Sequence, residues 1–114
     1  MKNRPRVITF KQAAKGMTKL NREIRYKSIF ENRRFSSGLI VFRSGSDRDP
    51  KQIRHSSKDV LCQVLKGRGR LRIHGRRIML QAGTLCHIPK KIPHDFAAGK
   101  NGDLVLLYSL IKTG

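Results

Sequence analysis

The sequence contains no tryptophan and few acidic residues. Seven Asp and Glu stand against 26 Lys and Arg, so the 114-residue chain carries a formal net charge of +19. A charge of this sign and size attracts polyanions and repels cationic partners, whatever the fold. A basic surface that is merely solvated has the same composition. The charge therefore leaves open whether a nucleic acid or another polyanion is a partner.

Long apolar runs are also missing. No stretch approaches the roughly 18 to 20 consecutive apolar residues of a membrane helix, and no secretory signal pattern opens the sequence. We therefore predict a cytoplasmic protein with no membrane partner. Only two cysteines occur, Cys62 and Cys86, and both fall inside apolar segments. This position predicts reduced, buried thiols, with a disulfide between the two as the alternative.

The length and the hydrophobic content of 38% predict one domain with a modest core. We expect a basic N-terminal arm over residues 1–23 and a single barrel domain over residues 24–114. Apolar residues from Phe10 to Leu20 recur at nearly helical spacing, although Gly16 weakens a helix. Three interpretations compete: an ordered arm packed on the barrel or on a partner subunit, a flexible basic tail, and an amphipathic transit peptide. We prefer the ordered arm.

From Ile24 onwards, short apolar segments alternate with turn residues. This pattern predicts strands rather than helices. We expect strands over residues 24–29, 38–42, 53–55, 60–65, 70–73, 76–81, 85–88 and 104–111, with Gly67 and Gly69 as turn residues and a loop over 44–50. Many short strands without a long helix are typical of an antiparallel sandwich or barrel.

The segment from Gly83 to His94 is the most constrained part of the chain. Gly83 permits a tight turn, and Pro89 must end the strand before it. Pro89 and Pro93 also restrict the residues that precede them to extended geometry. His94 is therefore presented from a rigid arc, which suits a group that holds a ligand.

This segment resembles the second motif of the cupin family, G-x5-P-x-G-x2-H-x3-N. Gly83, Pro89 and His94 occupy motif positions. Lys91 stands where the second glycine is usual, and Ala98 stands where the asparagine is usual.

The first cupin motif, G-x5-H-x-H-x3-4-E-x6-G, is matched upstream by Gly67 and by His55 at the second histidine. Ile53 occupies the first histidine position and Val60 the glutamate position. The resemblance covers roughly residues 38–110. It implies an all-β fold, an antiparallel jelly-roll barrel of the double-stranded β-helix type, and a homodimer.

Cupins hold a divalent metal inside the barrel with three histidines and a carboxylate. The resemblance assigns His55 and His94 to such a site, and strand alternation offers Cys62 as a third donor if its face is inward. Two imidazoles alone bind a metal weakly. We therefore predict no cofactor or a weakly bound divalent metal, and we leave open whether the chain is an enzyme.

Two other histidines lie outside the cupin positions. His74 and Gly75 form a plausible two-residue hairpin turn, which would place His74 at the surface. His87 adjoins Cys86, so the two side chains are expected on opposite strand faces.

Three functions follow from this reading. The first is binding of a small organic ligand, with anions among the candidates, in a pocket formed by His55, His94, Cys62, Val60, Ile53 and Ile88. The second is binding of a nucleic acid or another polyanion at the outer surface by Arg68, Arg70, Arg72, Arg76 and Arg77. The third is a metal-dependent cupin enzyme, a dioxygenase or an isomerase.

Overall fold

The computed structural model describes residues 5–45 and 57–113. Within these residues the elements, in chain order, are α1 (Phe10–Ala13), β1 (Thr18–Lys19), β2 (Ile24–Glu31), β3 (Phe35–Phe42), β4 (Lys58–Lys66), β5 (Arg68–Ile73), β6 (Arg76–Gln81), β7 (Leu85–Ile88), β8 (His94–Ala98) and β9 (Leu104–Lys112). The predicted strand over 53–55 and most of the predicted loop over 44–50 lie outside the described residues.

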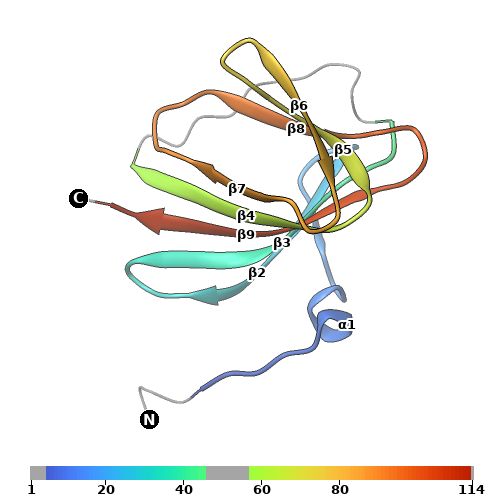
Figure 1. Cartoon of the computed structure of the whole chain (residues 1–114). Helices are drawn as coiled ribbons and strands as arrows, with labels where there is room; N and C mark the ends of the chain where they lie inside the picture. Colours follow the sequence, from blue (N-terminus) through green and yellow to red (C-terminus); the bar gives the residue numbers. More distant parts are fainter. Residues whose placement is uncertain (1–4, 46–56, 114) are drawn as a thin grey trace.

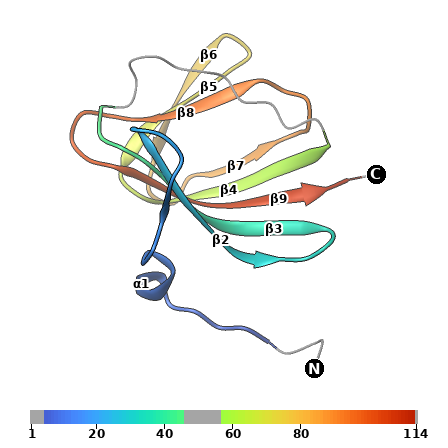
Figure 2. The ribbon, with the colours of Figure 1, turned by 180° about the vertical axis from the view of Figure 1, so that it is seen from behind.

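The strands form two antiparallel sheets. Sheet A has the order β1-β2-β3-β9-β4-β7, and sheet B has the order β6-β5-β8. The two sheets lie in separate layers, with sheet B above sheet A in the view of Figure 1 and also from behind in Figure 2. The predicted all-β antiparallel jelly roll is confirmed, and its described strands form two separate sheets rather than one closed barrel.

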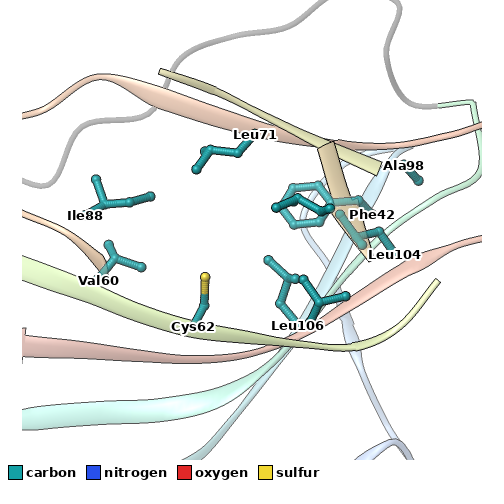
Figure 3. Packing of buried hydrophobic residues seen from close by; sticks show 10 residues of the cluster. Phe42, Val60, Cys62, Leu71, Ile88, Ala98, Leu104 and Leu106 are labelled. Atoms are coloured by element: carbon teal, nitrogen blue, oxygen red, sulfur yellow. The ribbon is translucent and has the colours of Figure 1, made fainter. Parts of the chain in front are cut away.

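The core lies between the layers and follows from strand alternation. In β4, Val60, Cys62 and Val64 are buried, whereas Leu61 and Gln63 are exposed on the opposite face. Figure 3 shows Cys62 and Val60 projecting from β4 toward Leu71 of sheet B. The buried cluster comprises Phe42, Val60, Cys62, Val64, Leu71, Leu80, Ile88, Ala98, Leu104 and Leu106.

Tight turns connect the strands of sheet B. His74 and Gly75 have φ angles of 52° and 71°, so both residues of the β5–β6 turn are left-handed, as in a type I′ hairpin. The predicted hairpin is confirmed, and His74 is exposed. Gly67 has a φ of 89°, and a Cβ there would lie 2.0 Å from the backbone oxygen of Asp103. Gly69 differs from the prediction, because it lies inside β5 rather than in a turn.

Residues 5–23 of the predicted N-terminal arm form one short helix and one short strand. The helix begins at the N-cap Thr9, which forms a capping box with Gln12, and ends at Ala13. The helical spacing that continues to Leu20 is misleading, because Gly16 adopts a φ of 67° and the next residues pair with β2 as strand β1. Helix α1 lies on the side of sheet A that faces away from sheet B (Figure 1). In the described ranges, no helix has the length and apolar character to cross a membrane.

Candidate functional site

The segment from Gly83 to His94 leads from sheet A to sheet B. Gly83 has a φ of 93°, and the strand that follows it ends at Ile88, just before Pro89. Lys91, at the second glycine position of the cupin motif, has a φ of 71°. This left-handed conformation favours glycine, so the turn keeps the backbone shape of the motif without its glycine. His94 is then the first residue of β8.

His94 is held in a defined orientation. Its side chain is buried, at 4% exposure, and its Nδ1 lies 2.9 Å from the Ile92 carbonyl oxygen. Its ring also meets the Phe96 ring edge-to-face, with 5.9 Å between the ring centres. A carbonyl only accepts, so Nδ1 carries the proton of this hydrogen bond. In the neutral imidazole, Nε2 therefore keeps its lone pair, which is the form that binds a metal or accepts a ligand's proton.

A cavity of about 360 Å³ lies between the inner face of sheet A and His94. Its lining is mostly apolar, and its residues with a polar group in the side chain are one histidine, two tyrosines and one cysteine. The lining residues are Leu20, Tyr26, Ile40, Phe42, Val60, Cys62, His94, Phe96, Leu106, Tyr108 and Leu110. Its size and composition fall within the range of small-molecule sites.

The Tyr108 phenol at this cavity is held in its neutral form. Burial raises the pKa of the Tyr108 phenol, and the nearby Glu31 carboxylate and Tyr26 add to the rise. The charged form of a group loses hydration when it is buried, so the neutral phenol is favoured. Tyr108 is therefore kept as a hydrogen-bond donor at neutral pH.

The structure brings together some of the predicted pocket residues. Val60, Cys62 and His94 line the cavity, while Ile88 is 1% exposed in the adjoining core and does not line it. Ile53 and His55 lie outside the described residues. Sequence reasoning did not assign Leu20 or the aromatic residues to the pocket. Alternation along β2 and β9 was the signal that could have found Tyr26 and Tyr108.

The described residues do not supply the metal-binding set that a cupin uses. Across residues 5–45 and 57–113, no three side chains of His, Cys, Asp or Glu come together as ligands. At the cavity, the described donors are His94 and Cys62, and the apolar Val60 stands at the carboxylate position. These residues fit a hydrophobic ligand better than a metal ion.

On sheet B, two of the arginines predicted to contact a polyanion pair with a buried carboxylate. Arg70 is 4% exposed and pairs with Asp95, which is equally buried. Arg72 Nη2 lies 2.9 Å from the other carboxylate oxygen of Asp95. Arg70 and Arg72 thus share one buried carboxylate, which ties both guanidinium groups to the fold. The Arg72 side chain stays 30% exposed, and Arg70 also lines a groove on sheet B.

The remaining arginines of this prediction are accessible. Arg68, Arg76 and Arg77 are exposed on the β5–β6 hairpin. Arg68 and Arg77 also line a groove of about 690 Å³, together with Lys100 from the loop after β8. This groove lies outside the core and presents positive charge.

His87 lies on the outer face of sheet A, as its spacing from Cys86 predicts. Its Nε2 lies 3.1 Å from the Asp59 carboxylate, which also accepts a hydrogen bond from the Lys90 backbone N–H. The hydrogen bond from His87, followed by that from Lys90, lowers the pKa of Asp59. This pairing joins residues 28 positions apart and was not evident from the sequence.

Two packed antiparallel sheets around a cavity that carries a buried histidine define the chain as a small jelly-roll domain. A family model described as "Cupin domain" matches residues 38–110, and the chain belongs to this family. Comparison with curated protein sequences finds no match.

Solved structures with the same fold have low sequence identity. The Schizosaccharomyces pombe Cnp3 cupin domain has a TM-score of 0.79 at 12% identity, over 95% of this chain and 76% of that one. An RmlC-like cupin from Shewanella frigidimarina NCIMB 400 has a TM-score of 0.77 at 14% identity, over 99% of this chain and 96% of that one. Fe(II)-HppE with the alternative substrate (S)-1-HPP has a TM-score of 0.71 at 15% identity, over 78% of this chain and 50% of that one. These similarities show the fold.

Proposed function

We propose that this cupin binds a small organic ligand in the cavity between its sheets. The observation that carries the proposal is the cavity of about 360 Å³, whose apolar lining is joined by the buried His94. Apolar walls favour the body of a ligand, and a few fixed polar groups determine its orientation. The ligand class is a small aromatic or aliphatic molecule with a single polar group.

The polar group that we propose for this ligand is a carboxylate. The chain carries a formal net charge of +19, so its field favours anions. The Tyr108 phenol, kept neutral by its surroundings, is a donor at the cavity. A protonated His94 would add a second donor, whereas neutral His94 accepts through Nε2.

The proposal is for binding and contains no metal-dependent step. The described donors at the cavity are too few to hold a metal firmly, since structural and catalytic sites use three or four protein ligands. The prediction of no metal or a weakly bound divalent metal stays a prediction, as does the alternative of a dioxygenase or isomerase.

A pair of adjacent substitutions tests the location of the site. Ile40 lines the cavity, and its neighbour Val41 points to the opposite face of β3. We expect Ile40→Trp to fill the cavity and Val41→Trp to leave it open. Both variants are first checked for native amide spectra, so that loss of binding is separated from loss of folding.

Binding is measured by amide NMR titration with three probes of similar shape: benzoate, benzyl alcohol and benzylamine. We expect saturable shifts at cavity residues, strongest for benzoate, in the wild type and in Val41→Trp and absent in Ile40→Trp. Shifts that persist in Ile40→Trp, or that affect only surface arginines, would contradict the cavity. A preference for benzyl alcohol or benzylamine would contradict the anionic ligand.

A second candidate function is polyanion binding at the exterior. It is favoured by the exposed Arg68, Arg76 and Arg77 and by the basic groove beside them. On duplex DNA, each neutralised phosphate changes the salt slope of binding by about 0.9. We expect non-specific association that fades near physiological salt, because the described surface offers few aromatic side chains for base stacking.

Matched pairs of arginines test this second function. The double substitution Arg76→Ala with Arg77→Ala is compared with Arg33→Ala and Arg34→Ala, which lie at the exposed turn between β2 and β3. If the site lies on the β5–β6 hairpin, only the Arg76→Ala and Arg77→Ala pair should lower the salt slope of binding to a DNA duplex. Equal losses from both pairs would show that the net charge, and no particular site, causes the association.

A further inference from the structure

Two thiols face one another across the edge of sheet A. Cys62 of β4 and Cys86 of β7 are directly opposite in the antiparallel register, so their side chains lie on the same face. Both cysteines are free. Opposed residues of an antiparallel pair have Cα atoms about 4.5 to 5.5 Å apart, which lies within the range of about 4.4 to 6.8 Å that a disulfide spans.

The two thiols differ in accessibility. Cys62 is 6% exposed and lines the cavity, whereas Cys86 is partly exposed on β7, which ends the strand order of sheet A. A strand bonded to one neighbour shifts more easily than a central strand, so β7 can make the small approach that a disulfide requires. A reagent from solvent therefore reaches Cys86 first.

The hydrogen bond between the thiols gives them different chemical roles. The hydrogen bond from Cys62 lowers the pKa of Cys86 to about 7, against an opposing contribution from burial. The same hydrogen bond, followed by burial, raises the pKa of Cys62. Cys86 is thus the thiol that reacts as a thiolate, and Cys62 is its neutral partner.

We propose that Cys86 and Cys62 form a reversible oxidation site for hydrogen peroxide. The Cys86 thiolate attacks a peroxide oxygen, the O–O bond breaks, and Cys86 becomes a sulfenic acid as hydroxide leaves. The Cys62 sulfur then attacks the Cys86 sulfur, and the S–O bond breaks as the S–S bond forms. The Cys62 proton leaves with that hydroxyl as water. Two thiols and one peroxide thus give one disulfide and two waters, and a dithiol restores the reduced form.

Formation of the disulfide would also change the lining of the cavity. The Cys62 sulfur points into the space between the sheets in Figure 3, and the bond to Cys86 draws it toward β7. Tyr108, the register partner of Cys62 on β9, lines the same cavity. The amide signal of Tyr108 therefore reports the change, whether or not a ligand ever occupies the cavity.

The test uses the full chain, reduced and then treated with hydrogen peroxide at neutral pH. We expect a monomer whose mass falls by two hydrogens, the loss of both free thiols, a shifted Tyr108 amide signal, and reversal of all three by dithiothreitol. A chain that keeps both thiols, forms intermolecular disulfides, or goes directly to sulfinic acid would overturn the proposal.

Two variants test whether the hydrogen bond from Cys62, rather than exposure alone, makes Cys86 reactive. Alkylation of Cys86 by iodoacetamide is followed against pH in the wild type, where we expect a midpoint near the Cys86 pKa of about 7. Cys62→Ser keeps a donor and should preserve a low midpoint, whereas Cys62→Ala removes it and should move the midpoint toward that of an ordinary cysteine. Equal midpoints in Cys62→Ala and the wild type would overturn the assignment of Cys62, and native amide spectra confirm that each variant is folded.

Discussion

The inner face of sheet A and the outer face of sheet B bury their side chains in opposite ways. Sheet A covers a partly empty cavity with apolar groups such as Ile40 and Leu106, whereas sheet B buries the charged pair Arg70 and Asp95. An apolar wall is stabilised by the area that each side chain removes from water. Truncation of one apolar side chain therefore removes only the contribution of that side chain. A buried ion pair depends on both partners, since removing one leaves an uncompensated charge.

The largest expected effect therefore comes from breaking the pair on sheet B. Asp95→Asn keeps the shape of the side chain and removes the charge that faces Arg70 and Arg72. We expect the free energy of unfolding to fall by about 3 to 5 kcal/mol, the cost of removing one partner of a buried ion pair. Urea unfolding followed by circular dichroism measures this loss.

Asp103→Asn is the matched control. Asp103 lies 3.6 Å from Arg43, and both side chains are more than 40% exposed. An exposed pair contributes about 0 to 1 kcal/mol, so this substitution should change stability little. Similar losses from Asp95→Asn and Asp103→Asn would contradict the contrast between the two faces.

On sheet A, truncation of a cavity-lining residue should cost less. Leu106 is 1% exposed, and Leu106→Ala enlarges the cavity that it lines. We expect a loss of about 2 to 3 kcal/mol, at the lower end for buried leucines. Leu107→Ala, on the opposite face at 38% exposure, is the control and should change stability by within about 0.5 kcal/mol. Urea midpoints of the two variants give the comparison, and equal values would contradict the assigned faces.

The contrast between the faces also explains what the sequence could predict. Alternation along β4 correctly placed Val60, Cys62 and Val64 on one face, and the structure shows that this face is buried. The glycine and proline of the Gly83–His94 segment correctly indicated a tight turn and a strand that ends before Pro89. These patterns depend on neighbouring residues and strand period, which a sequence displays directly.

Alternation failed where burial depends on a distant partner. The pattern from Arg70 to Ile73 is that of a half-exposed strand, yet Asp95 of β8 neutralises Arg70 and allows it to be buried. In the same way, the contact of Leu20 with the cavity depends on how the arm folds back onto β2. The predicted roles of Ile53 and His55, the arm boundary at residue 23 and the homodimer stay predictions.

The turn that links the two sheets offers a stabilising change. Lys91 has a φ of 71°, a conformation that costs a non-glycine residue about 1 to 2 kcal/mol. Lys91→Gly removes this cost but adds freedom to the unfolded chain, so we expect a net gain of about 0.5 to 1 kcal/mol. Thermal unfolding measures the gain. Lys90→Gly, at a neighbour without a positive φ, should give no gain, and a loss of stability in Lys91→Gly would contradict the strain.

The smallest effect concerns the response of the cavity to charge, and it appears only at high pH. The pKa of Tyr108 is raised above its ordinary value of 10.0, first by burial and then by Glu31 and Tyr26. Because the fold favours the neutral phenol, its contribution to stability is complete below the unfolded pKa and is lost as pH rises through the folded pKa. In an ultraviolet titration of phenolate, Tyr108→Phe should remove the late step, whereas Tyr26→Phe should leave Tyr108 titrating above pH 10.0. A late step that survives in Tyr108→Phe would show that Tyr108 is not the phenol that titrates late, and the contrast between its partly buried surroundings and the ion-paired face of sheet B would fail.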